Sequence, residues 1–315
     1  MLPLKLHKNT RSALKIVFAT LLMVGGVVTL LQFAPATASN SQPQPDIDRI
    51  AYAGFDGNDF EIFTVNPDGT NLVQITNNDV DDWGATWSPN GDYLAFRSMR
   101  DGYSGIYMMN ADGSDISRVS TSDMWAGDPY YQATMTWSPN GSYLAFSAFV
   151  DGNWDIYVSS LCNSGLVRMT TSAADDLHPS WSPNGQEIAF NSSRDGMLEI
   201  YSLDVYSGDI ERLTYNQEAT VMYPRYSPDG DQIVFFINAS GTDAELFLMN
   251  ADGSNIEQLT THAAVDRVAT FSPDGDSVVF RSERDGDSDI YTMNLRTGAI
   301  SQVTNDVNLN MAPDW

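Results

Sequence analysis

One short sequence pattern occurs five times in this chain at nearly constant spacing. Each copy opens with an aromatic residue followed by Ser-Pro-Asn/Asp-Gly, and continues with an apolar segment, a Gly-containing turn and a segment of the Ile-Tyr type. The opening residues are Trp87, Trp137, Trp181, Tyr226 and Phe271, and the chain stops at Trp315, where a sixth copy would begin. The successive spacings are 50, 44, 45, 45 and 44 residues. A period of about 40–50 residues with four strand-like segments per copy is the signature of a β-propeller.

The two ends of the chain complement each other. Strand-like segments at residues 50–53, 61–65 and 72–75 match the second, third and fourth segments of a copy, and residues 311–315 match the first. A ring of sheets in which each blade buries its neighbours closes when one blade combines both ends of the chain. The sequence therefore predicts an all-β, six-bladed β-propeller whose N-terminal strands pair with the C-terminal strand in one blade.

Residues 1–38 differ in composition from the rest of the chain. Four basic residues flank an uncharged apolar run over residues 16–33, and Ala36-Thr37-Ala38 has the small-x-small form of a signal peptidase site. We predict a signal peptide at residues 1–38, a linker at 39–47 and the propeller at 48–315. Because the run is 18 residues long, near the minimum for a membrane span, an uncleaved N-terminal anchor is the alternative. Either form places the propeller in the periplasm, at the cell surface or in the medium.

The chain is strongly acidic, with a formal net charge of −25 at pH 7, and no lysine follows Lys15. This balance argues against binding to nucleic acid or to an anionic membrane surface. It is explained either by solubility or by a basic partner. The single cysteine, Cys162, excludes an intrachain disulfide, and no pairing of nucleophile and base is evident, so no catalytic residue is assigned.

The repeat Trp-Ser-Pro-Asn-Gly-x-x-Ile/Leu-Ala-Phe-x-Ser-x-Arg-Asp-Gly-x-x-x-Ile-Tyr resembles the WD-like repeat of TolB-type β-propellers. The resemblance covers residues 48–315 and implies the propeller fold. TolB itself adds an N-terminal α/β domain, for which residues 39–47 leave no room. Similar propellers occur in oligogalacturonate lyases, which hold a metal with histidines around the channel. Only His178 and His262 follow the leader here, so a site of several histidines is not expected.

Carboxylates occur in alternating copies five residues before the opening aromatic. The residues at this position are Asp82, Gln132, Asp176, Val221, Asp266 and Asn310. In a six-bladed ring, the three aspartates are expected near the channel mouth, related by roughly a threefold rotation. They are candidates for holding a cation or a basic side chain at the axis. The alternative is that each caps backbone N–H groups or pairs with an arginine.

We expect both histidines in loops that join the last strand of one copy to the first strand of the next, on the face where we place function. His178 and His262, together with nearby aspartates, are candidate metal ligands. Separate, surface-exposed histidines are the alternative, because no ligand-spaced pair is present. The Asp285–Asp289 segment spaces three carboxylates two apart, but position twelve of a calcium loop would be Arg296, so turn chemistry explains this segment.

The 50-residue spacing marks an insertion at residues 120–135. This loop carries Trp125, Tyr130 and Tyr131, whose rings offer stacking faces for a sugar or anchors for a protein. The alternative is that the rings fold back over a blade edge.

These features predict an exported, non-catalytic scaffold that binds a protein or glycan partner at the cell envelope. The expected ligand-binding residues are Asp82, Asp176, Asp266, His178, Trp125, Tyr130 and Tyr131. No cofactor is expected beyond a divalent cation as an alternative, and membrane contact is expected only through an N-terminal anchor. The competing hypothesis is a lyase or hydrolase acting at the channel mouth, with or without a metal.

Overall fold

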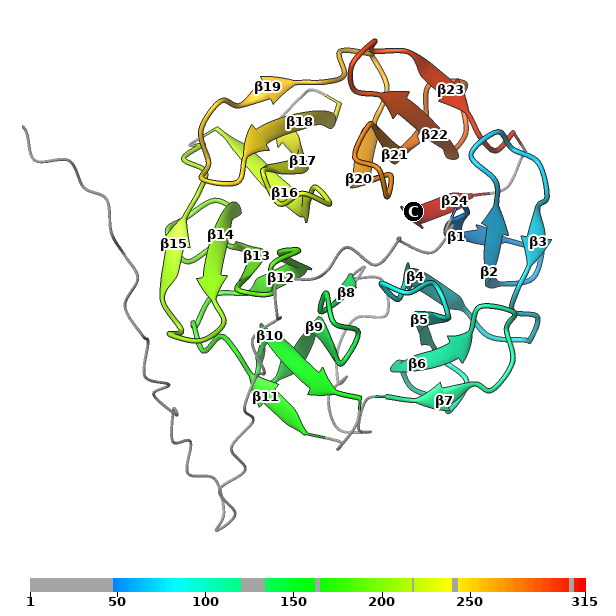
Figure 1. Cartoon of the computed structure of the whole chain (residues 1–315), viewed down its shortest axis with the longest axis horizontal. Coiled ribbons are helices and arrows are strands. Elements are labelled where there is room, and N and C mark those ends of the chain that lie inside the picture. Colours follow the sequence, from blue (N-terminus) through cyan, green and yellow to red (C-terminus); the bar gives the residue numbers. More distant parts are fainter. Residues whose placement is uncertain (1–47, 120–133, 162–164, 217, 240–242, 306–308) are drawn as a thin grey trace, which may run out of the picture.

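The computed structural model describes residues 48–119, 134–161, 165–216, 218–239, 243–305 and 309–315. These residues form 24 strands and no helix. The strands make six four-stranded sheets arranged as blades around a ring, which confirms the predicted all-β propeller (Figure 1). The predicted signal peptide and linker lie outside the described residues. Within the described residues, no helix has the length and apolar character needed to cross a membrane.

Each blade runs from an inner strand to an outer strand, and we number the blades along the chain. Blade 1 comprises β4 (Asp82–Trp87), β5 (Tyr93–Ser98), β6 (Gly105–Asn110) and β7 (Ser117–Arg118). Blade 2 comprises β8 (Met135–Trp137), β9 (Tyr143–Val150), β10 (Asn153–Ser160) and β11 (Leu166–Arg168). Blade 3 comprises β12 (Asp176–Trp181), β13 (Glu187–Ser192), β14 (Glu199–Asp204) and β15 (Ile210–Arg212).

The remaining blades follow the same order. Blade 4 comprises β16 (Ala219–Tyr226), β17 (Gln232–Ala239), β18 (Glu245–Asn250) and β19 (Glu257–Gln258). Blade 5 comprises β20 (Asp266–Phe271), β21 (Ser277–Ser282), β22 (Asp289–Asn294) and β23 (Ile300–Gln302). Blade 6 combines β24 (Asn310–Asp314) with β1 (Ile50–Phe55), β2 (Phe60–Val65) and β3 (Val73–Gln74).

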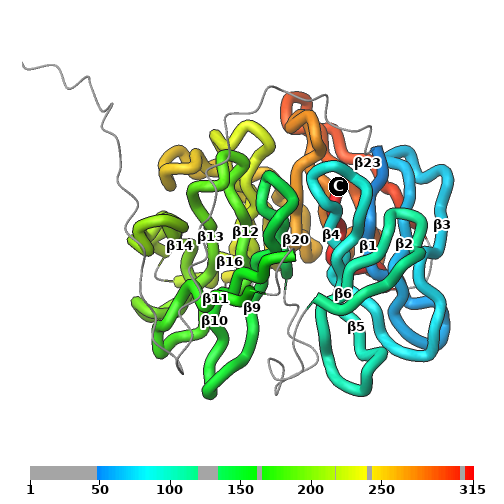
Figure 2. Tube along the Cα trace, turned by 60° about the horizontal axis from the view of Figure 1, so that its bottom comes forward, coloured from blue at the N-terminus to red at the C-terminus, as the bar shows by residue number. Residues whose placement is uncertain are grey.

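Blade 6 brings the two ends of the described chain together. Strand β24 pairs antiparallel with β1, with Ala51 opposite Asp314 and Gly54 opposite Asn310. The Trp87 N–H of blade 1 donates to Asp314 Oδ2 at 2.8 Å, so the C-terminal strand also contacts the next blade. Figures 1 and 2 both show the C-terminus enclosed by the ring, beside β1 and β4.

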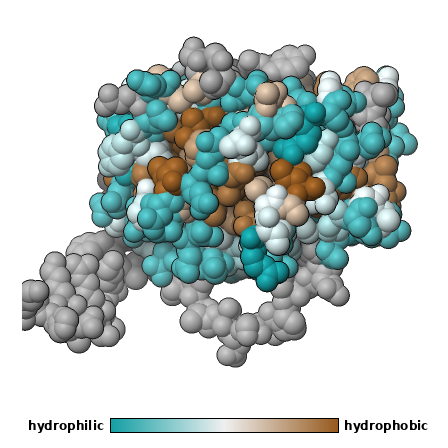
Figure 3. All heavy atoms as spheres, turned by 90° about the horizontal axis from the view of Figure 1, so that it is seen from above, coloured by the Kyte–Doolittle hydropathy of each residue, from teal (hydrophilic) through white to brown (hydrophobic). Residues whose placement is uncertain are grey.

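The core lies between blades, because the second and third strands carry apolar residues on both faces. Leu94, Ala95 and Phe96 of β5 are fully buried. One cluster joins Leu94 and Phe96 of blade 1 to Ala53 and Ile62 of blade 6. Such contacts explain why the repeat is stable only as a closed set of neighbours. The outer surface in Figure 3 is mostly hydrophilic, with apolar residues in separate groups.

The inner strands share a bulge three residues before the opening aromatic. There the backbone takes a positive φ in five blades, at Gly84 (63°), His178 (55°), Tyr223 (58°), Val268 (54°) and Ala312 (49°). A β-branched or aromatic side chain rarely adopts this conformation without tertiary support. At this bulge, His178 of blade 3 stacks on Tyr223 of blade 4, as described below.

Candidate functional site

The three alternating aspartates lie at the start of inner strands and are fully buried. Each forms an ion pair with an arginine 18 residues later in its own blade. The pairs are Asp82–Arg100 at 3.0 Å, Asp176–Arg194 at 3.0 Å and Asp266–Arg284 at 2.9 Å. Each guanidinium also lies over two aromatic rings; for Arg194 these are Phe190 and Tyr201.

The structure therefore gives these three carboxylates partners inside their own blades, as in the arginine-pairing alternative. Among the described residues, neither group of acids close enough to share a metal ion contains Asp82, Asp176 or Asp266. The sequence holds a signal for the pairing. Arginine occurs 18 residues after the aspartate in the same three copies, whereas blade 4, which has Val221 in place of the aspartate, has Ala239 there.

A second set of carboxylates recurs near the start of the third strand of each blade. Its members are Glu61, Asp155, Glu199, Glu245 and Asp289, and Gly105 takes this place in blade 1. A threonine 15 residues later accepts a hydrogen bond from the backbone N–H that follows the carboxylate. The same threonine hydroxyl donates to the carboxylate, for example Thr214 to Glu199 at 2.5 Å. We refer to these acids as the third-strand carboxylates.

Blades 2 and 3 neutralise this carboxylate with an arginine from the outer strand. Arg168 pairs with Asp155, and Arg212 pairs with Glu199 at 3.0 Å. In blades 4, 5 and 6 the register-equivalent residues are Gln258, Gln302 and Gln74. Burial raises the pKa of Glu245 and Asp289, and raises that of Glu61 to about 7. Three adjacent blades thus contain buried acids without the arginine.

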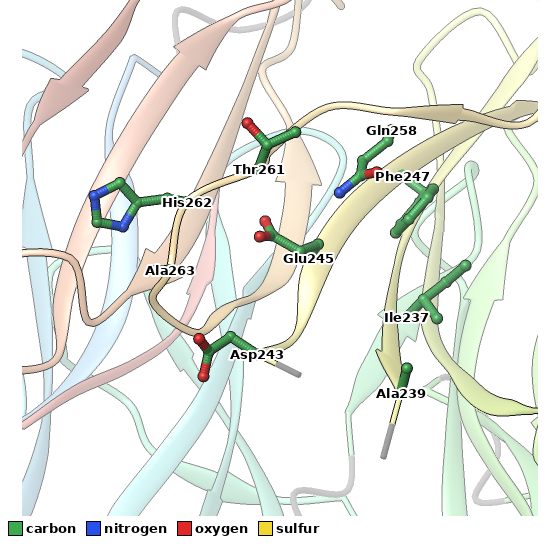
Figure 4. A pocket seen from close by; sticks show the side chains of 9 residues that line it. All are labelled: Ile237, Ala239, Asp243, Glu245, Phe247, Gln258, Thr261, His262 and Ala263. Atoms are coloured by element: carbon green, nitrogen blue, oxygen red, sulfur yellow. The ribbon is translucent and has the colours of Figure 1, made fainter. Parts of the chain in front are cut away.

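The third-strand carboxylate of blade 4 borders a cavity of about 500 Å³. The lining residues are Ile237, Ala239, Asp243, Glu245, Phe247, Gln258, Thr261, His262 and Ala263. Figure 4 shows Glu245 in the middle of the group, with Phe247 and Ile237 on one side and Asp243 and His262 on the other. We call this cavity the blade-4 pocket.

The pocket is lined by Gln258, which holds the register position that Arg168 and Arg212 hold in blades 2 and 3. Phe247 lies opposite Gln258, as Tyr201 lies opposite Arg212. The Gln258 amide donates to the Thr260 carbonyl at 2.8 Å, and Thr260 Oγ1 donates to Glu245 at 2.5 Å. The pocket consequently offers a carboxylate beside an aromatic wall. An arginine or lysine side chain can pair with the carboxylate through its charge and lie against the aromatic ring at the same time.

His178 does not lie on the surface, and its predicted place in a loop is wrong. It belongs to β12 and is 1% exposed. Its ring stacks on Tyr223 of blade 4 with centroids 3.7 Å apart, and Nδ1 lies 3.2 Å from Asn191 Oδ1. The Tyr223 N–H donates to the same Asn191 oxygen. The bulge turns His178 into the blade 3–blade 4 interface, where its stacking is structural.

His262 is exposed at the rim of the blade-4 pocket, as expected for a loop histidine. Neither histidine belongs to the acidic groups that could hold a metal among the described residues. The aromatic loop with Trp125, Tyr130 and Tyr131 lies outside the described residues, as does Cys162. Sequence reasoning missed the pocket because its signal is a substitution, Gln258 for arginine, in an outer strand of two residues.

The TolB β-propeller domain profile matches residues 125–223 and 216–315. The solved TolB of Acinetobacter baumannii has a TM-score of 0.74 and 21% identity, covering 85% of this chain but 66% of that protein, slightly under two thirds of its length. A TolB structure from Agrobacterium tumefaciens gives 0.68 and 25% identity, covering 81% and 88% of the two chains. An oligogalacturonate lyase in complex with manganese gives 0.54 and 17% identity over 83% and 73%.

Proposed function

Because the chain belongs to the TolB β-propeller domain family, we propose that it is a non-catalytic binding scaffold of the cell envelope. Its partner is a protein that inserts a basic side chain into the blade-4 pocket. The observation that carries this proposal is the pocket itself, in which a partly buried Glu245 lies with Phe247 and with Gln258, the residue that replaces the outer-strand arginine of blades 2 and 3.

The charge of the chain supports a basic partner. The whole chain has a net charge of −25, and residues 1–38 carry four basic residues and no acid, so the exported domain has a net charge of −25 − 4 = −29 and no lysine. Such a domain attracts cationic surfaces and speeds their encounter. A guanidinium in the pocket would reproduce the contacts that Arg212 makes in blade 3, a carboxylate pair beside an aromatic ring. Such a desolvated, aromatic-lined anchor is the kind of contact that dominates binding energy.

Export is the second part of the proposal and rests on the leader at residues 1–38. N-terminal sequencing of the protein recovered outside the cytoplasm should begin at Ser39. Recovery of Met1 in the membrane fraction would instead identify a retained anchor.

Calorimetric titration of the propeller with a hexa-arginine peptide at about 0.15 M salt, where exposed charges are screened, tests the pocket. We expect Glu245→Gln to weaken binding about fivefold, since an ion pair with the half-buried Glu245 contributes up to about 1 kcal/mol. Gln258→Arg should abolish binding by filling the pocket. Glu257→Gln is the matched control, because Glu257 is an exposed acid on the same strand. Equal binding by all four proteins would refute the pocket.

The lyase alternative is tested on the same preparation. Polygalacturonate with and without manganese should yield no unsaturated product, because His178 is buried against Tyr223 and is not available to a substrate. Manganese-dependent product formation would establish the enzyme and remove the scaffold proposal.

A further inference from the structure

We propose that Asp56, Asp59 and Glu61, in the β1–β2 hairpin of blade 6, form a binding site for Ca²⁺. One carboxylate oxygen from each lies within 4.8 Å of the others. Oxygens bound to one Ca²⁺ at about 2.4 Å are at most about 4.8 Å apart, so the spacing of these three oxygens is compatible with a shared ion. The site is separate from the blade-4 pocket and independent of the partner proposed above.

Asp59 is the observation that distinguishes this group from an ordinary acidic turn. Asp59 is 7% exposed, and neither carboxylate oxygen accepts a hydrogen bond of ordinary length and angle, although the Asn58 side chain lies beside it. A buried carboxylate without a donor is costly unless it is paired or coordinates a metal. Asp56 and Glu61 lie beside it, so neighbouring side chains increase the negative charge instead of compensating for it.

The fold explains why, among the described residues, no arginine forms an ion pair with these three acids. In blades 2 and 3 an arginine of the outer strand reaches the third-strand carboxylate, but blade 6 has Gln74 at that register position. Gln74 makes one long contact, 3.4 Å to Asp56 Oδ2. A bound divalent cation would supply the positive charge that arginine supplies elsewhere.

Hydrogen bonds from neighbouring residues hold the carboxylates of Asp56 and Glu61 in place. Asn58 and Asp59 N–H groups donate to Asp56 Oδ1, which orients that carboxylate. The Asn78 side chain donates to both Glu61 and Asp82, at 3.2 and 2.8 Å. Two of the three ligands are therefore already positioned by hydrogen bonds, which lowers the cost of ordering them around an ion.

The chemistry of the group favours calcium. All the ligands are carboxylate oxygens, which suit hard cations. Asp56 is exposed, so water can complete the shell around an ion. Ca²⁺ accepts such irregular sets of six to eight oxygens, whereas Mg²⁺ demands a near-octahedral shell and gives up its waters reluctantly.

Blade 5 supplies an internal control. Asp285, Asp287 and Asp289 form a similar group. Asp285 accepts from Gln302, and Asp289 accepts from Gln302, Thr304 and Asn310. Among the described residues, no buried carboxylate of that group lacks a partner. It therefore has less need of a cation.

The test is calorimetric titration of the EDTA-treated propeller with CaCl₂, repeated with MgCl₂. We expect one Ca²⁺ site with weaker Mg²⁺ binding, and a melting temperature that rises with CaCl₂. Asp59→Asn, which keeps the side-chain shape, should weaken Ca²⁺ binding about tenfold or more. Asp287→Asn should leave it unchanged. Gln74→Arg should raise the melting temperature in EDTA and abolish the response to Ca²⁺.

Three outcomes would overturn the proposal. One is the absence of both heat and a thermal shift for the wild-type protein with Ca²⁺. Another is undiminished Ca²⁺ binding in folded Asp59→Asn protein. The third is loss of binding in Asp287→Asn with retention in Asp59→Asn, which would assign the ion to blade 5.

Discussion

Blades 3 and 4 have the same strand order and register, yet their third-strand carboxylates differ. Glu199 of blade 3 pairs with an arginine of its own blade, whereas Glu245 of blade 4 borders a pocket. In blade 3, Glu199 accepts a hydrogen bond from Thr214 and forms an ion pair with Arg212. In blade 4, Glu245 accepts a hydrogen bond from Thr260 but has no ion pair with an outer-strand arginine, because that position holds Gln258. Blade 4 also has Ala239 at the position that Arg194 holds in blade 3, and both Ala239 and Gln258 line the cavity beside Phe247. Loss of arginine at these two positions therefore distinguishes blade 4 from blade 3, and four experiments test this comparison.

The largest loss of stability is expected when the pairing of β24 with β1 in blade 6, which we call the seam, is removed, because blades 3 and 4 both need a closed ring around them. Deletion of residues 311–315 removes most of β24, its pairing with β1, and the Trp315 contacts with the cluster containing Ile50 and Tyr52. We expect a loss of several kcal/mol from a typical total of about 5–15 kcal/mol. Urea unfolding and size-exclusion chromatography will measure it. A monomeric product with an unchanged unfolding midpoint would contradict the role of the seam.

Asp176→Asn tests whether the alternating aspartates serve the blades or an axial ligand. Removal of this carboxylate leaves the Arg194 guanidinium without its partner at 3.0 Å, so we expect a loss of about 2–4 kcal/mol. If the aspartates instead repelled one another around an empty site, neutralising one would stabilise the protein. The sign of the change in unfolding free energy separates the two interpretations.

Reciprocal exchanges test the comparison of blades 3 and 4 directly. Arg212→Gln should destabilise the protein by about 2–3 kcal/mol, since it leaves fully buried Glu199 without its cation. Gln258→Arg should raise the unfolding free energy by up to about 1 kcal/mol, because that pair remains partly exposed. Arg296→Gln, at an exposed turn position, is the control. Equal effects of the three changes would show that the outer-strand residue does not distinguish the blades.

The smallest effect is the pH dependence of hexa-arginine binding to the blade-4 pocket. Burial raises the pKa of Glu245 above 4.5, and Asp243 and Asp266 act in the same direction, whereas His262 opposes them. Only the ionised carboxylate attracts a guanidinium, so affinity should be full at high pH and fall as pH decreases through the raised pKa. The decline should begin above the range of an ordinary glutamate. His262→Asn controls for the histidine, and Glu245→Gln should flatten the profile.

The repeat predicted much of the fold, and the comparisons confirm the TolB-type resemblance. The site was less predictable. Asp82, Asp176 and Asp266 were found at equivalent positions, but their arginine partners lie 18 residues away, across a strand pair. His178 was misplaced because its burial depends on a bulge and on Tyr223 in the next blade. The 18-residue spacing repeats in the sequence and signals the pairing, whereas the burial of His178 does not follow from local pattern.

The sequence by itself determined the number of blades, the strand order within them and the strong negative charge, since periodicity and composition are properties of the chain alone. The tertiary structure decided which acids are neutralised. Asp155 and Glu199 form ion pairs with arginines of the outer strand, whereas the outer strands of blades 6 and 4 have Gln74 and Gln258, which donate to Asp56 and to the Thr260 carbonyl. Glu61 and Glu245 occupy the same place in the repeat without such an ion pair. The physical reason is that burial and charge compensation depend on residues of an adjacent strand or blade, which the ring brings to within hydrogen-bond distance.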